Sequence, residues 1–320
     1  MRTLKLSILI IIIVLLVACS TQDETASEKR VIKIGYLPIT HAAPLLYDHY
    51  LHDGSFDDYE LELVKFSSWP DLIDALNAGQ IDGASVLMQL AMQAKDIGID
   101  LKAVALGHED GNVIISAHNI DDANDLRGTT VAIPHTHSAH HLLLNELFME
   151  EGVTYEEVEL IEMPPPEMPA ALAEERISSY VVAEPFGALA VHLDAGKVLA
   201  HSEDVWPNSY CCVLVLRDEF IEQDKELVTS FVSSYVEAGK LADEKTEQLY
   251  DALKTYLDVS DEVLDVSLAW ISFDSLHIEE EEYEKLSDRI LRLQLMDDVP
   301  SYEEFVDPSF IEKMSESDGS

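Results

Sequence analysis

Two groups of side chains in this sequence have the chemistry of metal ligands. Histidines are concentrated in residues 135–141, which read His-Thr-His-Ser-Ala-His-His, and two cysteines are adjacent at 211 and 212. Imidazole nitrogens and thiolates are ligands that Zn²⁺ prefers. The spacing matches no standard zinc pattern, so it does not define a complete set of ligands. His135, His137 and Cys212 are the candidate ligands for an ion such as Ca²⁺ or Zn²⁺. The alternative is that the two cysteines are small core residues of an apolar strand.

His140 is the strongest single candidate for contact with a small ligand. It lies in the first turn of a predicted helix over residues 138–150, which Ser138 begins. A helix N-terminus presents free N–H groups and a partial positive charge, which together favour an anion. His140 shares a helix face with four apolar residues, so it points inward; these are Leu143, Leu144, Leu147 and Phe148. The alternative is a half-buried histidine that only packs.

Other candidates follow the predicted strands, where loops gather at one edge of a sheet. The ligand-binding candidates chosen by this criterion are His41, Trp69, Met88, His108 and Glu184. Cys211 is a further candidate, because its segment is expected to enter the cleft near a second crossover. Taken singly, each is equally well explained as a loop residue, a helix cap or, for Trp69, a packing aromatic.

The elements that must position these residues alternate along the chain. Strand-like runs are expected at 31–37, 61–66, 81–87, 101–106, 113–117, 129–133, 158–163, 180–183 and 211–216. Amphipathic stretches lie between them, for example at 70–78, 138–150 and 167–175. This alternation predicts an α/β protein with mixed, largely parallel sheets. Beyond about residue 222 the apolar spacing predicts a helical C-terminal extension, with helices at 225–243, 246–258 and 280–295.

A sequence motif that occurs twice indicates two lobes of similar design. The motif Ala75-Leu76 with Ile81 recurs as Ala171-Leu172 with Ile177, 96 residues later. Each copy reads as a helix, a tight turn and a strand. Two lobes of this kind hold a ligand in the cleft between them.

An ordered set of motifs resembles a family of transport proteins. The motifs are Gly35-Tyr36-Leu37-Pro38 with Ala43-Pro44-Leu45, Ser68-Trp69, Gly79-Gln80-Ile81-Asp82-Gly83, Leu126-Arg127-Gly128, Ser138-Ala139-His140, Met163-Pro164-Pro165-Pro166-Glu167-Met168 and Glu184-Pro185-Phe186. In this order they resemble the solute-binding proteins of nitrate/sulfonate/bicarbonate (NitT/TauT) ABC importers. The resemblance covers about residues 31–220 well and the helical tail loosely.

The resemblance implies a type II periplasmic-binding-protein fold with two α/β lobes around a ligand cleft. It implies a binding protein and not an enzyme, which captures a small anion or small polar nutrient and delivers it to permease subunits in the membrane. It also implies that His140 contacts the ligand. We expect lobe 1 at 31–118, lobe 2 at 119–207, and a return to lobe 1 with the C-terminal helices at 208–320.

The N-terminus predicts export and anchoring. A basic start and an apolar run end in Leu16-Val17-Ala18-Cys19, which matches a bacterial lipoprotein cleavage box. The run is too short for a comfortable membrane span, although an uncleaved anchor helix is the alternative. We therefore expect a signal peptide at 1–18, lipidation of Cys19, and a flexible tether at 19–30 that holds the protein outside the cytoplasmic membrane.

The charge of the chain excludes one class of partner. Asp and Glu number 62 against 20 Lys and Arg, which gives a formal net charge of −42. Such a surface repels nucleic acid and anionic lipid headgroups. We read the excess as an adaptation for solubility in a saline or alkaline habitat, and we expect a monomer.

One departure from the family leaves the ligand open. No Lys or Arg occurs between Lys197 and Arg217, where nitrate binders keep a cationic side chain. A buried anion would then need helix dipoles, hydrogen bonds or a bound metal ion. The alternatives are a pyrimidine or thiamin-precursor heterocycle, a metal ion, or an enzyme on the same scaffold, for which no nucleophile elbow, phosphate loop or catalytic carboxylate pair is present.

Overall fold

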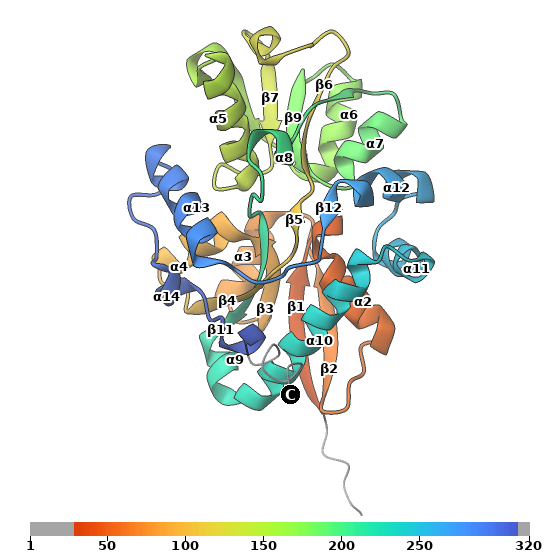
Figure 1. Cartoon of the computed structure of the whole chain (residues 1–320), viewed down its shortest axis with the longest axis vertical. Helices are drawn as coiled ribbons and strands as arrows, with labels where there is room; N and C mark the ends of the chain where they lie inside the picture. Colours follow the sequence, from red (N-terminus) through yellow and green to blue (C-terminus); the bar gives the residue numbers. More distant parts are fainter. Residues whose placement is uncertain (1–28, 313–320) are drawn as a thin grey trace, which may run out of the picture.

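The computed structural model describes residues 29–312 as two α/β lobes stacked one above the other (Figure 1). The predicted signal peptide, Cys19 and most of the tether lie outside the described residues. Within the described range, no helix is both long and apolar enough to cross a membrane.

Lobe 1 is built on a five-stranded sheet of order β2-β1-β3-β11-β4. Its strands are β1 (Arg30–Tyr36), β2 (Tyr59–Lys65), β3 (Gly83–Leu87), β4 (Leu101–Leu106) and β11 (Cys212–Arg217). β1 is parallel to β2 and β3, whereas β11 is antiparallel to β3 and β4. The central strands are fully buried, apart from the last residue of β11, and the edge strand β2 alternates buried and exposed residues, as expected for a sheet covered on both faces only at its centre.

Lobe 2 repeats this design with the order β10-β6-β9-β7-β8. Its strands are β6 (Asn112–Ser116), β7 (Thr130–Ile133), β8 (Glu159–Glu162), β9 (Ser179–Ala183) and β10 (Lys197–His201). The antiparallel strand is again second from one edge, here β6. β3 and β9 occupy equivalent places at the centre of their sheets. They begin at Gly83 and Ser179, which are 96 residues apart, the same spacing as the repeated motif in the sequence.

The chain crosses between the lobes twice. The first crossing runs from β4 to β6 through β5 (Glu109–Asp110), so the chain enters the second sheet before the predicted boundary at 118/119. The second crossing returns from β10, through α8 (Ser202–Val205), to β11. The predicted lobe ranges 31–118, 119–207 and 208–320 stay predictions as domain boundaries.

Helices cover both sheets. In lobe 1 they are η1 (Thr40–Ala42), α2 (Ala43–His52), α3 (Trp69–Asn77) and α4 (Met88–Asp96), and in lobe 2 η2 (Ala123–Leu126), α5 (Ala139–Glu151), η3 (Tyr155–Glu157), η4 (Pro165–Glu167), α6 (Met168–Ala173) and α7 (Phe186–His192). Local signals set their ends. The Ser138 hydroxyl caps α5 by accepting the His141 N–H, and Gly152 ends the helix with a left-handed φ of 67°.

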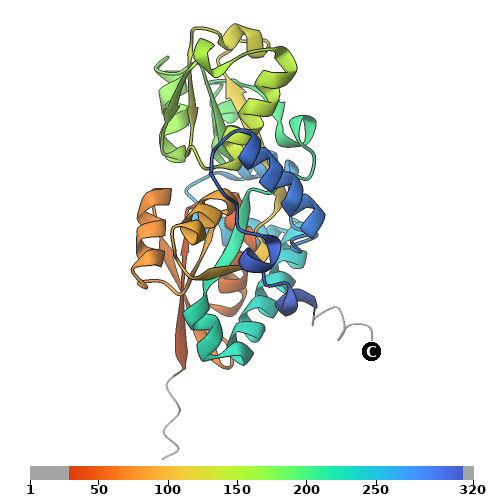
Figure 2. The same ribbon diagram turned by 90° about the vertical axis from the view of Figure 1, so that its left-hand side faces the viewer.

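The C-terminal extension packs first on lobe 1 and then passes beside the junction of the lobes (Figure 2). It comprises α9 (Asp218–Gln223), α10 (Lys225–Asp243), α11 (Glu247–Tyr256), α12 (Asp261–Ala269), β12 (Ile271–Ser272), α13 (Glu280–Arg292) and α14 (Tyr302–Phe305). β12 pairs with β5 in the first crossing. Arg292 of α13 bonds Glu146 of α5, and the Leu295 carbonyl lies 2.8 Å from His137 Nε2, so the extension also contacts lobe 2.

The core of lobe 1 predicts a clear stability effect. Leu214 in β11 is fully buried, whereas Leu193 after α7 is 61% exposed. We expect Leu214→Ala to lower the free energy of unfolding by about 2–5 kcal/mol, because it removes buried methyl groups and leaves a cavity. Leu193→Ala is the matched control and should change it by less than about 0.5 kcal/mol. Urea unfolding measures both, and equal effects would contradict this packing.

Candidate functional site: a buried histidine–cysteine cluster between the lobes

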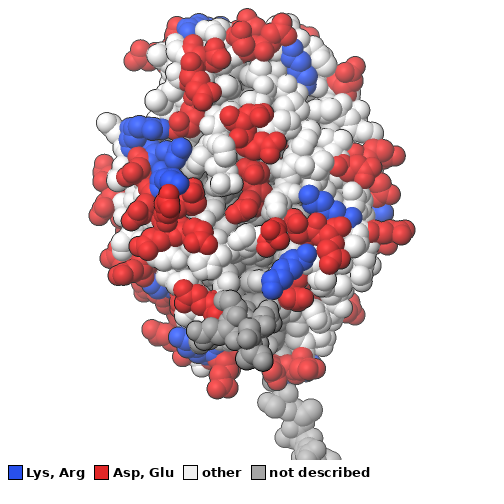
Figure 3. All heavy atoms as spheres, viewed as in Figure 1, with Lys and Arg blue, Asp and Glu red and all other residues white. Residues whose placement is uncertain are grey.

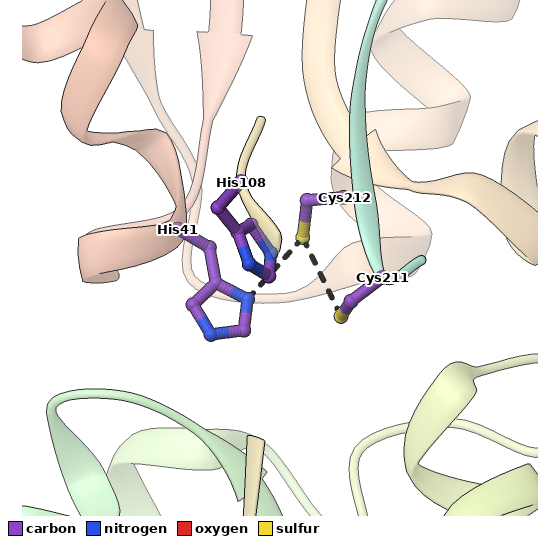
Figure 4. Close-up of side chains that lie close together, drawn as sticks. All are labelled: His41, His108, Cys211 and Cys212. Atoms are coloured by element: carbon purple, nitrogen blue, oxygen red, sulfur yellow. Dashed lines mark hydrogen bonds between the residues drawn. The ribbon is translucent and has the colours of Figure 1, made fainter. Parts of the chain in front are cut away.

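Four side chains from three distant segments of the sequence meet at the junction of lobe 1 and the two crossings. His41, His108, Cys211 and Cys212 each offer one ligand atom, and these atoms all lie within 4.8 Å of one another. We call these four residues the quartet. All four are fully buried. Figure 4 shows them converging from separate segments of lobe 1, above the ribbons of lobe 2.

The elements that carry the quartet follow directly from the topology. His41 lies in η1, immediately after β1, and His108 lies just beyond β4 at the start of the first crossing. Cys211 and Cys212 are at the start of β11, where the second crossing ends. The Gly107 N–H donates to the Cys212 carbonyl at 2.8 Å, which holds the two crossings together at this point.

The sulfur and nitrogen atoms are close enough to share an ion. Cys211 Sγ is 3.8 Å from Cys212 Sγ, and Cys212 Sγ is 3.7 Å from His41 Nδ1. The rings of His41 and His108 have centroids 3.6 Å apart. Neither ring nitrogen of His108 makes a hydrogen bond of ordinary geometry in the described part of the chain, although the Cys211 side chain and the Asp110 backbone lie near the ring. Buried polar atoms without a hydrogen bond are uncommon.

The protonation of the quartet suits a cation. Burial lowers the pKa of His108 to about 4, so its imidazole is neutral at physiological pH. Burial alone raises the pKa of Cys211, but its hydrogen bond with Cys212 and the neighbouring His140, His108 and His41 lower that pKa well below its usual value. Burial and the neighbouring Cys211 raise the pKa of Cys212 well above its usual value. The surroundings therefore favour the thiolate at Cys211 over that at Cys212, and neutral imidazole and thiolate are the forms that bind metal.

Lobe 2 supplies two buried polar residues on the other side of the junction. His140 in α5 is fully buried, and neither of its ring nitrogens has a partner among the described residues. Burial lowers the pKa of His140 to about 4. The neighbouring Cys211 acts to raise this pKa, and His41 and His108 act to lower it. Glu184 follows β9, and its carbonyl accepts the Thr40 N–H at 2.9 Å, which joins lobe 2 directly to η1.

The remaining candidates from the sequence have other surroundings. Ser138 donates to the His135 carbonyl at 2.6 Å while it caps α5, so its hydroxyl has structural partners. Met88 donates its N–H to the Cys211 carbonyl at 2.7 Å, which places it beside the quartet. Trp69 is 2% exposed, and its indole N–H has no partner in residues 29–312.

The structure does not bring His135 and His137 into the quartet. His137 Nε2 lies 2.8 Å from the Leu295 carbonyl, and His135 Nδ1 accepts the His137 N–H at 3.0 Å. Their partners belong to the loop itself, to the C-terminal extension and to α4 of lobe 1, where the Gln93 side-chain nitrogen lies 3.1 Å from His137 Nε2. Sequence reasoning missed Asn112, whose buried side-chain amide has no partner in the described chain, and Gly111, whose carbonyl bonds His41. A signal for Gly111 was available, because His-Glu-Asp-Gly after a strand predicts a turn.

The fold and the sequence were compared with those of known proteins. The ligand-binding component of an ABC-type import system from Staphylococcus aureus, crystallised with zinc bound, is 44% identical, with a TM-score of 0.85 over 89% of this chain and 99% of that one. The periplasmic nitrate-binding protein NrtA from Synechocystis has a TM-score of 0.81 at 16% identity, over 91% of this chain and 89% of that one, and so supports the fold alone. The predicted type II periplasmic-binding-protein fold is confirmed.

Curated relatives are more distant. The nitrate import ATP-binding protein NrtC of Synechocystis is 26% identical over 74% of this chain, and a putative aliphatic sulfonates-binding protein of Escherichia coli is 24% identical over 69% of this chain and 70% of its own length. The chain spans only 39%, 37% and 35% of the lengths of the first three curated relatives.

Burial of Glu184 predicts an unusual pH dependence of stability. Burial raises its pKa to about 8 from 4.5, against hydrogen bonds from the Ala188 N–H and the Ser267 side chain. The folded protein therefore binds this proton more tightly than the unfolded chain, and the stability contributed by Glu184 decreases as the pH rises from 4.5 through about 8. Glu184→Gln cannot titrate, so we expect wild type to lose on the order of 5 kcal/mol relative to it over this range, at about 1.4 kcal/mol per pKa unit. Urea unfolding at several pH values measures the difference, and parallel profiles would contradict the burial of a titrating carboxyl.

The sequence-based resemblance to binding proteins for nitrate and sulfonate is confirmed by these comparisons. Residues 25–256 match one family model, which covers most of the chain. The chain belongs to the NMT1-like family.

Proposed function

We propose that this protein is the extracytoplasmic solute-binding component of an ABC importer, and that its quartet captures a soft divalent metal ion, with Zn²⁺ as the reference. Support for the transport role comes from the family and from relatives that are binding proteins of import systems. The same relatives agree with the prediction that the chain is not an enzyme. Support for the metal comes from the quartet and from the zinc bound to the Staphylococcus aureus relative.

The spacing of the quartet is the observation that carries the choice of ligand. With Zn–S bonds of about 2.3 Å and Zn–N bonds of about 2.0 Å, a tetrahedral site separates two sulfurs by roughly 3.8 Å and a sulfur from a nitrogen by roughly 3.5 Å. The distances here are 3.8 Å for the two sulfurs and 3.7 Å for Cys212 Sγ to His41 Nδ1. Two imidazoles and two cysteines suit Zn²⁺, whereas Ca²⁺ prefers oxygen ligands.

The surface charge fits the delivery of a cation. Acidic side chains are scattered over the face seen in Figure 3, and basic ones are few. A negative surface raises the local concentration of divalent cations and repels nucleic acid. We further propose that the protein acts as a monomer anchored by a lipid on Cys19, and that its closed form docks on permease subunits.

A small anion of the nitrate, bicarbonate or sulfonate class is the second candidate, which the sequence favoured. His140 supports it, because a fully buried imidazole without a partner at the N-terminus of a helix is suited to an oxyanion. The absence of Lys and Arg between Lys197 and Arg217 counts against an anion that binds alone. The relatives offer no support for a heterocycle, the remaining alternative.

The proposed metal site predicts the effect of removing one sulfur. We expect purified wild-type protein to bind one Zn²⁺, and Cys212→Ser to bind it at least about 100-fold more weakly, because a hydroxyl is a poor substitute for a thiolate. Competition with a chromophoric chelator gives the affinities. Zinc at about 100 times its Kd should add roughly 2.7 kcal/mol to the stability of wild type, which a thermal shift detects.

Controls separate a specific site from surface binding and from the anion hypothesis. His118→Ala changes an exposed histidine that lies near Asp194, outside the quartet, and should leave the zinc affinity unchanged. The same thermal-shift panel includes nitrate, bicarbonate with and without Ca²⁺, and alkanesulfonates. A shift with one anion and none with Zn²⁺ would replace the metal by the anion as the ligand.

A further inference from the structure

The first interlobe crossing contains a short hinge with an unusual backbone. Asp110 and Gly111 are consecutive residues with left-handed φ angles of 57° and 76°. Such angles are costly for Asp110 and ordinary for glycine. A Cβ added at Gly111 would lie 2.8–2.9 Å from Ile271 atoms of β12, so this position accepts only glycine without a shift. The backbone at Asp110 and Gly111 therefore has a left-handed geometry that its surroundings must stabilise.

His41 connects this hinge to the quartet through its two ring nitrogens. Its Nε2 lies 2.8 Å from the Gly111 carbonyl oxygen. A carbonyl only accepts hydrogen bonds, so Nε2 carries the proton and donates. In the neutral ring, Nδ1 then has a free lone pair, and it faces Cys212 Sγ at 3.7 Å inside the quartet. One imidazole thus presents a metal ligand on one side and holds the hinge on the other.

His108 attaches the other end of the same hinge to the same site. It is the first residue of the 108–111 segment and belongs to the quartet. An ion bound to both histidines closes a ring that runs from the ion through His108, along the backbone to Gly111, and back through His41. The partner of a metal-bound imidazole orients the ring and strengthens it as a ligand.

No member of the quartet lies on a strand or helix of lobe 2. His41 and Cys212 belong to lobe 1, and His108 and Cys211 lie in the crossings. An ion held by these four therefore does not join the lobes by ligating both of them. Its influence on their relative orientation has to pass through the crossings.

We propose that the captured metal ion clamps the first interlobe crossing, with His41 as the residue that transmits metal occupancy to Gly111. The clamp rests on the proposed metal-binding function. Binding removes the freedom of residues 108–111 to relax from their left-handed geometry, and this fixes the lobes in the closed arrangement. Closure is set at the hinge, where the Gly111 carbonyl also accepts the Glu184 N–H of lobe 2 at 3.4 Å.

Hydrogen exchange of the hinge amides tests the clamp. In wild type, saturating Zn²⁺ should slow exchange in a peptide covering residues 107–112 by at least about tenfold, because local opening must first break the ring. His41→Cys supplies a thiolate to the ion and has no N–H for the Gly111 carbonyl. When His41→Cys is loaded at saturating zinc, we expect its hinge amides to exchange as fast as those of the ion-free wild type. Small-angle scattering should show the loaded variant less compact than loaded wild type.

A second pair of variants keeps the test decisive if His41→Cys fails to fold or to load zinc. Gly111→Ala retains all four ligands but places a methyl group against Ile271, which displaces the carbonyl. Gly98→Ala is its matched control, because Gly98 has a left-handed φ of 100° with nothing within 4 Å. We expect zinc to protect the hinge of Gly98→Ala and not that of Gly111→Ala.

The outcomes distinguish the clamp from the function on which it rests. Zinc binding by wild type without protection of residues 107–112 would overturn the clamp and leave the metal site standing. Full protection in loaded His41→Cys or Gly111→Ala would overturn the role of the Gly111 bond. Failure of wild type to bind zinc would overturn the proposed function, and the clamp with it.

Discussion

The arrangement of the molecule depends on one constraint, which is that polar side chains buried between two lobes must find partners. The quartet and His140 are fully buried, and several of their nitrogen atoms have no hydrogen bond within the described chain. Leaving such a group unpaired costs about 1–3 kcal/mol. Under the proposed metal-binding function, an ion that binds nitrogen and sulfur would satisfy the atoms of the quartet at once. Recognition and closure would then be two consequences of the same burial.

The repeated design of the lobes explains why the site lies where it does. Each sheet takes its antiparallel strand directly from an interlobe crossing, β11 in lobe 1 and β6 in lobe 2. The crossings are therefore packed against central strands and are not free linkers. Residues at their ends, such as His108 and Cys211, lie next to the sheet, are fully buried, and gather near His41, which follows β1. A chain with a single crossing could not gather ligands in this way.

The C-terminal extension contributes to the site without supplying ligands. β12 pairs with β5, and Ile271 excludes any side chain at position 111. This contact sets the position of the Gly111 carbonyl, and so the orientation of the His41 ring. Arg289 of α13 stacks over Trp206 with its guanidinium carbon 4.3 Å from the ring centre, which adds a contact near the second crossing. Packing at the edge of the molecule in this way determines geometry at its centre.

The sequence by itself determined most of the central strands and long helices, the two-lobed repetition and the family, because apolar periodicity and turn residues are local signals. It did not predict the edge strand β10 or helix α12. It also named each quartet residue singly, since all four follow or begin a strand at the edge where loops converge. Only the tertiary structure decided which of them meet. His41 and Cys212 are 171 positions apart. The histidine-rich segment at 135–141, conspicuous in the sequence, places His140 near the quartet, whereas His137 bonds Gln93 and Leu295 instead. The physical reason is that strand order and the path of the crossings are set by packing between distant segments, and spacing along the chain carries no record of that packing.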